Sequence, residues 1–444
     1  MSSYNSSGFD VNSKDLDSSE RHDRLSELPD SLILSILSFL SMYDVVRTTI
    51  LSKRWKDLWV TIPCLHFIII RDIHFRYVDF INGALAQWKC SKMLKFSLHL
   101  SYQFGHSFDS DIHSWLLFAI EKQVEELSID LDSRYSNFVA PQRLYSCSSI
   151  TKLSLAFHDL EIEDKVQWNK LKSLTIRVDE SLSEEVMNQV LCGAPHLEEL
   201  ILSFREISKN LNIRSTSLKM LKIDAYTSSC NAAVLGIWAP NLVTLEISGV
   251  VYHDYSLVPS CTHVILSLKK SDWEFLPCEN FTQVFGSISH VEKLTLSEWC
   301  IKLLLFMKDR NMDVPFSNAK FLKLYVHEDD EMLDVFVFFP KLMHTIIDHR
   351  DDKDPSYFVA PKHLDTLDYH KAFFRSPSLV ELRTVEITWS AGDASIIQVM
   401  ECLSEKAHKL EKMVLQLRMA GEEKTLLEDI YPICLGHICM FGNL

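Results

Sequence analysis

The sequence predicts an α/β protein in which a short helical module precedes a curved stack of strand-forming repeats. Three observations support this prediction. Between Leu25 and Trp59, three short amphipathic segments follow one another with almost no linker. After Pro63 the pattern Leu-x-x-Leu-x-Leu recurs along most of the chain. The 444 residues are 47% apolar and 24% charged, enough to bury the core of two or three domains or of one solenoid.

The first helical segment opens at Leu28-Pro29-Asp30, since proline suits a helix start, where its missing N–H would have no partner. Apolar residues follow at helical spacing, at Ile33, Ile36, Leu37 and Leu40.

The second helix is predicted to start at Ser41, which can cap it, and to turn Val45, Val46 and Ile50 to the interior. A third helix begins near Ser52 and ends at Pro63, and one face of it carries Trp55, Leu58 and Trp59. A module this small buries little surface, so we expect an apolar face left for a partner.

The repeated pattern is the strand signature of leucine-rich repeats, with a short strand on the concave side and a helix or loop on the convex side. Its central anchors step by 21 to 26 residues at the start of the series, within the range of this repeat class. They are Leu127, Leu153, Leu174, Leu200, Leu221, Leu245, Leu294, Leu322, Val385 and Met413.

Degenerate repeats are expected at 67–70, 94–100, 261–266 and 364–369, and the apolar run Val335–Phe339 suits a buried strand. An ordinary α/β domain is the alternative. Both folds would show alternating apolar and polar residues in their strands. The solenoid is favoured because the full spacing of three anchors also recurs.

Composition excludes several function classes. The eleven glycines form no nucleotide-binding loop and no nucleophile elbow, so no cofactor is predicted. A net charge of −15 weighs against nucleic acid, and Trp55 and Trp59 fit a helical core better than a base-stacking platform. No apolar run is long enough for a membrane span. With no signal peptide and eleven scattered cysteines, we expect the cytosol or the nucleus.

Candidate metal and catalytic sites are weak. Cys434, His437 and Cys439 form the one tight Cys/His cluster, but three crowded ligands fall short of the four that a zinc site uses. The acidic runs 328–331 and 348–354 lack the spacing of a calcium loop. No nucleophile stands beside a base in any known motif. We therefore predict neither a metal site nor catalysis by this chain.

Residues 24–65 resemble the F-box of plant F-box proteins. The resemblance rests on Leu28-Pro29-Asp30, on Ile36-Leu37-Ser38-Phe39-Leu40, on Val46-Arg47-Thr48 and above all on the string 51–59, LSKRWKDLW. Met42-Tyr43 departs from the family pattern before the second helix. The stretch 361–417 is similar to the FBD region that ends many plant F-box/leucine-rich-repeat proteins, through Val385-Glu386-Ile387, Gly392 and Leu410-Glu411.

This resemblance implies a substrate receptor in a Skp–cullin–F-box ubiquitin ligase. The F-box would bind a Skp-type adaptor and through it the cullin and RING subunits, while the repeats would hold an unknown protein substrate. The family pattern places five residues in the adaptor contact: Leu28, Pro29, Ile33, Leu37 and Leu40. It places Trp55 and Leu58 in the F-box core. A non-degradative scaffold is the alternative.

The predicted domains are a disordered tail at 1–21, the F-box at 22–65, the repeats at 66–360, FBD-like terminal repeats at 361–417 and a tail at 418–444. The substrate surface should consist of residues that alternate with the anchors on the concave face. The charged and aromatic ones among them are Asp130, Arg177, Lys222, Asp224, Glu246, Lys323 and Tyr325. The sequence does not decide whether a small molecule completes this surface.

Overall fold

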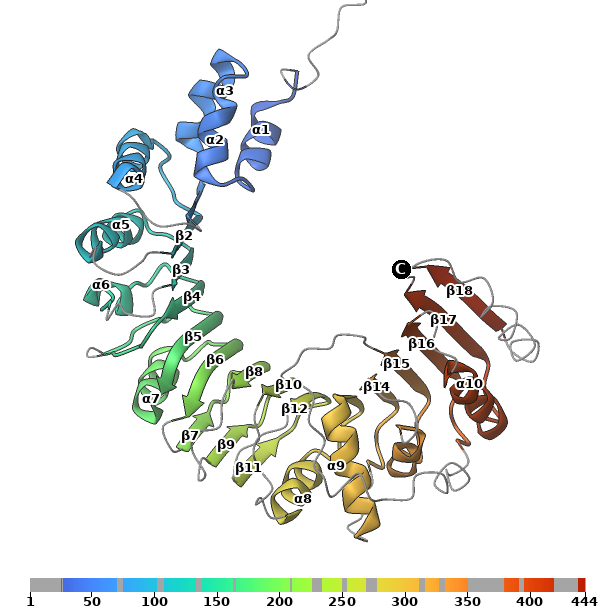
Figure 1. Cartoon of the computed structure of the whole chain (residues 1–444). Coiled ribbons are helices and arrows are strands. Elements are labelled where there is room, and N and C mark those ends of the chain that lie inside the picture. The colour runs from blue at the N-terminus through green and yellow to red at the C-terminus, as the bar shows by residue number, and fades with distance from the viewer. Residues whose placement is uncertain are drawn as a thin grey trace, which may run out of the picture.

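A computed structural model gives the fold of the chain. It describes residues 25, 27–69, 75–101, 108–132, 138–162, 165–207, 210–225, 234–249, 254–268, 278–310, 316–326, 332–349, 379–390, 395–418 and 438–443. A small helical module at the N-terminal end is followed by one long curved sheet, and the sheet bends into a horseshoe (Figure 1). The predicted fold class is confirmed.

Three short helices and one 3₁₀ turn build the N-terminal module: α1 (Asp30–Leu37), α2 (Met42–Thr48), α3 (Lys53–Leu58) and η1 (Trp59–Thr61). Serines cap two of them. Ser41 Oγ accepts a hydrogen bond from the Asp44 N–H at the start of α2, and Ser52 Oγ accepts one from the Trp55 N–H at the start of α3. The predicted helix starts therefore follow from local side-chain chemistry.

The curved sheet has fifteen parallel strands, and its order follows the chain except that β7, β9 and β11 are absent from it. Its strands are β1 (Cys64–Ile69), β2 (Lys95–Ser101), β3 (Glu126–Asp132), β4 (Lys152–Phe157), β5 (Ser173–Leu182), β6 (Glu199–Ile207), β8 (Met220–Ala225), β10 (Thr244–Gly249), β12 (His263–Leu268), β13 (Lys293–Leu296), β14 (Phe321–Val326), β15 (His344–His349), β16 (Thr384–Ser390), β17 (Lys412–Arg418) and β18 (Ile438–Asn443).

The register aligns the predicted anchors directly. Leu127 of β3 pairs with Leu153 of β4, and Leu153 pairs with Leu174 of β5. Such anchors are buried along the sheet, so a continuous apolar ladder forms the core of the solenoid. Residues between the anchors point to the concave side and remain partly exposed, as the alternating burial of β8, β10 and β12 shows.

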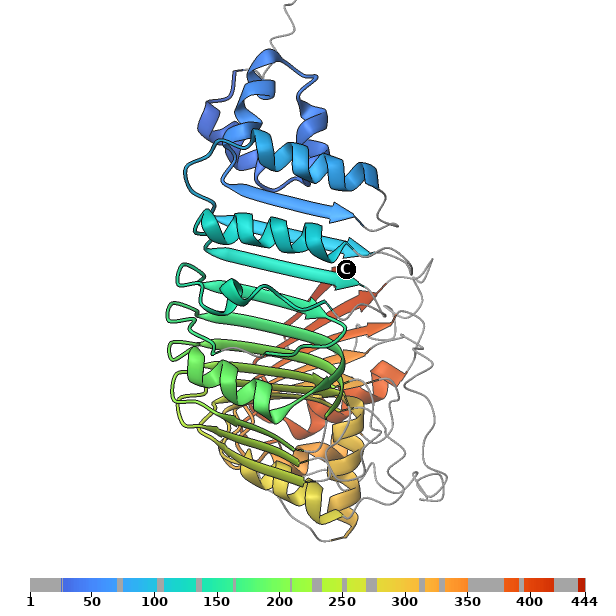
Figure 2. The same ribbon diagram turned by 90° about the vertical axis from the view of Figure 1, so that its left-hand side faces the viewer.

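The convex side is covered by helices and by a second sheet (Figures 1 and 2). The helical elements are α4 (Phe75–Gln87), α5 (Asp109–Glu121), α6 (Gln142–Tyr145), α7 (Glu184–Gly193), α8 (Cys278–Ser287), α9 (Glu298–Asp309), η2 (Met332–Phe338) and α10 (Ser395–Lys406). The second sheet has three parallel strands in the order β11 (Asp254–Pro259), β9 (Val234–Ala239) and β7 (Asn210–Arg214).

Two predictions of elements need correction. The run Val335–Phe339 lies mostly within the 3₁₀ helix η2 and is not a strand, because the apolar layer it joins is on the convex side. Strand β15 (His344–His349) was not predicted, and strand β18 (Ile438–Asn443) lies in the stretch predicted to be a C-terminal tail. The expected repeat at 364–369 lies outside the described residues.

Two of the predicted domain boundaries fall within the described residues next to or inside a strand. The boundary between residues 65 and 66 falls inside β1, and the boundary between 417 and 418 falls at the end of β17. The boundary at 360 lies outside the described residues.

Candidate partner-binding surfaces

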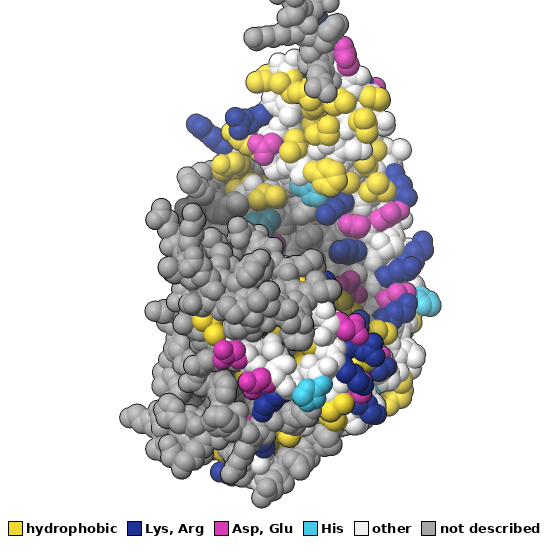
Figure 3. Space-filling model, turned by 90° about the vertical axis from the view of Figure 1, so that its right-hand side faces the viewer, with side chains coloured by type: hydrophobic (Ala, Val, Ile, Leu, Met, Phe, Trp, Pro, Cys, Tyr) yellow, Lys and Arg dark blue, Asp and Glu magenta, His cyan; other side chains and the backbone are white. Residues whose placement is uncertain are grey.

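The N-terminal module exposes a set of large apolar side chains, which we call the apolar patch. Its six members lie between residues 32 and 51 and are between 41% and 88% exposed: Leu32, Ile36, Phe39, Tyr43, Ile50 and Leu51. In Figure 3, yellow side chains gather over the top of the molecule, where this module lies, above the hollow of the horseshoe. Six exposed apolar residues in so short a segment make this face a candidate partner-binding surface.

The structure corrects the residues predicted for the adaptor contact. Ile33 and Leu37 are fully buried in the module core, so the prediction that they line the contact is wrong. Pro29 is exposed, whereas Leu28 and Leu40 are half-buried against the core. Both faces of α1 are apolar, and periodicity alone could not decide which face turns inward.

The exposed face of α1 consists of Leu32 and Ile36, four residues apart, and Phe39 follows the helix. Ile50 was predicted to face the interior but is 87% exposed, because it lies in the turn after α2. Sequence reasoning therefore missed most of the patch. Of the predicted core pair, Trp55 is 3% exposed and Leu58 is half-buried against the same core.

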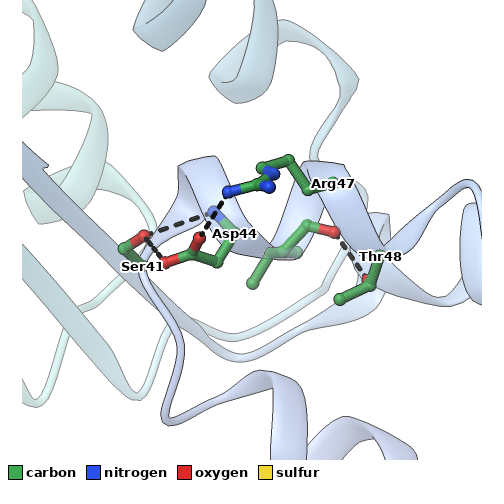
Figure 4. Close-up of polar contacts among 5 residues, drawn as sticks. Ser41, Asp44, Arg47 and Thr48 are labelled. Carbon is green, nitrogen blue, oxygen red and sulfur yellow. Dashed lines mark hydrogen bonds and ion pairs between the residues drawn. The ribbon is translucent and has the colours of Figure 1, made fainter.

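Polar contacts fix helix α2 beneath the patch (Figure 4). Ser41 Oγ donates to Asp44 Oδ2 at 2.7 Å, and Arg47 Nη1 lies 3.8 Å from Asp44 Oδ1. At the other end of the helix Thr48 Oγ1 donates to the Val45 carbonyl at 2.7 Å. On the module's surface, Arg54 of α3 also pairs with Asp30 of α1. Of these contacts, only the pair of Arg54 and Asp30 joins two helices, whereas the others stabilise α2 itself.

The module is joined tightly to the first repeat. Trp88 Nε1 donates to the Ile62 carbonyl at 2.8 Å in a buried position, and the Lys89 N–H donates to the Val60 carbonyl at 2.8 Å. His66 of β1 contacts the Ser38 carbonyl through Nε2 at 3.0 Å. The apolar patch is therefore held in a fixed position relative to the sheet.

All seven residues predicted for the substrate surface lie at outward positions of the concave face. Most are already paired. Arg177 of β5 reaches across β4 to Asp130 of β3 at 2.5 Å, since Ala156 between them has a small side chain. Asp130 Oδ2 also lies 2.9 Å from His99 Nδ1.

A second pair joins Lys222 Nζ to Glu246 Oε1 at 2.6 Å. Lys323 lies 3.8 Å from Asp348 and also stands over the ring of Tyr325, at 4.7 Å from its centroid. Asp224 makes no ion pair or side-chain hydrogen bond to any described residue. Over the described residues, the concave face thus presents neutralised pairs beside at least one charge, Asp224, that lacks an ion-pair partner there.

The described residues hold no group of three or more His, Cys, Asp or Glu side chains that could bind a metal. The cluster of Cys434, His437 and Cys439 cannot be assessed, since its side chains lie outside the described part. Burial raises the pKa of the Cys261 thiol to about 11, so this cysteine is no activated nucleophile. Over the described residues, none of the helices has the length and apolarity to cross a membrane.

Comparison with known proteins decides the family. The F-box domain model matches residues 25–67, and the model of the LRR repeats of FBD-associated F-box protein At5g56370 matches residues 112–265. F-box/LRR-repeat protein 25 of Arabidopsis thaliana is 32% identical over 213 residues, which cover 47% of this chain and 78% of that protein. The chain belongs to the F-box/LRR-repeat family.

Two further Arabidopsis thaliana relatives extend the similarity. FBD-associated F-box protein At5g22730 is 26% identical over 439 residues, which cover 93% of this chain and 92% of the relative. Putative F-box protein At1g49610 is 29% identical over 311 residues, which cover 68% of this F-box/LRR-repeat chain and 77% of that protein. The matched family models end at residue 265, so the FBD-like nature of 361–417 remains a prediction.

Proposed function

We propose that this F-box/LRR-repeat protein is the substrate-recognition subunit of a Skp–cullin–F-box ubiquitin ligase. F-box/LRR proteins generally act as such adaptors and are typically non-catalytic, and F-box domains generally bind Skp-type proteins. In this proposal the chain contributes proximity and orientation. The adaptor brings the cullin and RING subunits, and the concave face holds the substrate protein.

The apolar patch is the observation that supports adaptor binding most directly. Phe39 and Ile50 are 88% and 87% exposed, which is costly for a surface that stays in water. Aromatic and aliphatic side chains of this kind form the centre of protein interfaces, where a few residues provide most of the binding free energy. At the edge of the patch, Arg47 of α2 lies over the ring of Tyr43, 5.8 Å from its centroid.

Charge introduced into the patch tests the proposal. Phe39→Asp in the full chain should weaken binding to a purified Skp-type adaptor at least about tenfold, because an apolar anchor is replaced by a desolvated carboxylate. The measurement is isothermal titration calorimetry. Val243→Asp serves as the control, since Val243 is exposed to 50% at the start of β10, far from the module. Full binding by the Phe39 variant would contradict the proposed adaptor surface.

The proposal includes a reducing compartment, cytosol or nucleus. It is supported by the free thiols at all seven cysteines whose side chains the structure describes. Fractionation of cells that express a tagged full chain would test it, and recovery in a secreted fraction would exclude it.

A further inference from the structure

A row of outward side chains crosses the C-terminal third of the concave face, at the first position of each strand. The register from β13 to β17 places five residues side by side: Lys293, Phe321, His344, Thr384 and Lys412. We call this row the basic–aromatic strip. Neighbouring strands lie about 4.8 Å apart, so its two lysines stand about 19 Å apart along the sheet.

The lysines of the strip have no ion-pair partner in the part of the chain that the structure describes. Neither Lys293 nor Lys412 forms an ion pair with a described residue, whereas Lys222 and Lys323 on the same face are both paired. The strip itself contains no acid. Glu386, two residues further along β16 at the next outward position, is the nearest outward acid and lies 3.7 Å from His344. In a chain with a net charge of −15, this is a local excess of positive charge.

Two histidines beside these lysines have lowered pKa values, and burial is the main cause in both. Burial lowers the pKa of His263, and the charge of Lys293 lowers it further. Burial also lowers the pKa of His344; Glu386 opposes this shift, and Lys412 adds to it. Both imidazoles therefore stay neutral near pH 7, and the positive charge is concentrated on the two lysines.

Between the lysines lies an aromatic platform. The rings of Phe321 and His344 are stacked, with centroids 5.0 Å apart and an interplanar angle of 13°. Both residues are partly exposed, so the pair offers a rigid apolar surface of two rings. The rim beside it is neutralised, because Lys320 pairs with Glu292 and Arg383 with Glu411. Along the rim and into the hollow, Figure 3 shows basic and acidic side chains interspersed.

We propose that the basic–aromatic strip binds an acidic segment of a partner protein that carries an aromatic or large apolar side chain between its acids. The carboxylates would pair with Lys293 and Lys412, and the apolar side chain would lie on the Phe321–His344 stack. An extended chain rises about 3.3 Å per residue, so two acids about six positions apart would span the strip. This inference rests on the proposed function, since the partner would be the substrate.

The test uses three fluorescein-labelled twelve-residue peptides and the purified full chain at low salt, followed by fluorescence anisotropy. The first peptide has two Glu pairs six positions apart with a Tyr midway. The second replaces every Glu by Lys, and the third replaces the Tyr by Ser. We expect the first peptide to bind most tightly, the third more weakly and the second not at all, and the binding to weaken with salt.

Charge reversal locates the site. The double variant Lys293→Glu/Lys412→Glu should weaken the first peptide about tenfold or more, because two attractions become repulsions. Lys152→Glu is the matched control. Lys152 occupies the equivalent outward position on β4, is exposed and has no ion pair with a described residue, yet it lies outside the strip. It should leave the affinity unchanged.

Three results would overturn the inference: no preference for the first peptide over the second, an equal loss in the Lys152 variant, or displacement by a short single-stranded oligonucleotide at lower concentration than the unlabelled peptide. Adaptor binding by the same variants separates the two proposals. If the adaptor is retained while the peptide preference is absent, the strip proposal alone fails. If the adaptor does not bind while the peptide preference holds, the proposed ligase function fails and the strip stands as a partner site.

Discussion

At the scale of single residues, Thr345 stands out in the apolar ladder. It pairs in register with the anchors Leu322 and Val385, is fully buried, and its hydroxyl has no hydrogen-bond partner among the described residues. A buried polar group without a partner costs about 1–3 kcal/mol. Thr345→Val keeps the shape and removes the hydroxyl, so we expect the free energy of unfolding to rise by about 1 kcal/mol in urea denaturation.

The control is Thr175→Val, at a half-buried outward position of β5. That hydroxyl can reach water, and its loss should leave the stability nearly unchanged. A Thr345 variant that is no more stable than this control would mean that the hydroxyl is satisfied in solution, for example by a buried water.

His66 at the junction between module and sheet gives a prediction about pH. Burial and Lys95 lower its pKa, and this outweighs the opposing effects of the Ser38 carbonyl and Glu126. The folded state therefore binds fewer protons than the unfolded state below the ordinary pKa of about 6.5, and its stability falls as pH falls through that value.

His66→Gln removes this titration and keeps a side-chain N–H for the Ser38 carbonyl. Urea unfolding at pH 7.5, 6.5 and 5.5 should show a smaller loss of stability in the variant than in the unmodified chain. Identical losses in both proteins would show that other groups cause the acid sensitivity.

The sequence could not predict which residues of α1 are buried, because both faces of this helix are apolar. Ile33 and Ile36 are equally apolar, yet the first is buried and the second is 41% exposed. Only the positions of α2 and α3 decide which face of α1 turns inward. The seven residues predicted for the substrate surface, by contrast, were placed correctly on the concave face, because strand alternation fixes the side of the sheet. Their mutual pairing depends on register and could not be predicted.

At the scale of single elements, β10 ends at Gly249, whose backbone conformation is one that only glycine readily adopts. Gly249 has φ +92°, and an added Cβ would lie 1.7 Å from the Ala225 carbonyl oxygen on the neighbouring strand. Gly249→Ala should therefore lower the free energy of unfolding by about 2–3 kcal/mol or more, measured by chemical denaturation.

Gly83 in α4 offers a control, because replacing it by alanine should raise the stability of the chain instead of lowering it. An added Cβ there would meet nothing within 4 Å, so Gly83→Ala should stabilise the chain by about 0.5–1 kcal/mol through better helix propensity. Equal changes in the free energy of unfolding in both variants would show that alanine at position 249 causes no strain.

The junction of module and sheet gives a further prediction. A fragment of residues 22–65 ends inside β1 and lacks Trp88, whose Nε1 donates to the Ile62 carbonyl. We expect this fragment to be largely unfolded by circular dichroism and a fragment of residues 22–132 to show native-like helix and strand. A folded, adaptor-binding 22–65 fragment would show that the module is independent of the sheet.

The sequence predicted most strands of the main sheet because they carry a repeated set of three anchors, but it missed β15 and β18, which do not. It did not predict β7, β9 and β11, which are five or six residues long and lie on the convex side without that repeat. Nor did it separate a strand from the 3₁₀ helix η2 in the run Val335–Phe339, since a short apolar run has no period of its own. Elements without a repeat depend on the tertiary packing.

At the scale of the whole molecule, hydrogen bonds, one of them buried, join the module that carries the apolar patch to the sheet that carries the concave face. The helical module lies at one end of the horseshoe, and the curved sheet extends from it toward the C-terminal strands (Figure 1). A partner on the patch and a substrate on the concave face would therefore be held at a fixed distance from each other. Such a geometry suits a protein that positions a substrate for other subunits.

The most direct test of the central claim is co-purification of the tagged full chain with a Skp-type adaptor and a cullin, with Phe39→Asp as the matched control. We predict that the full chain retains both partners, and that the variant loses both while its repeats remain folded by circular dichroism. Retention of the adaptor without the cullin would contradict the ligase and indicate a non-degradative scaffold. Retention of neither by the unmodified chain would contradict the adaptor surface itself.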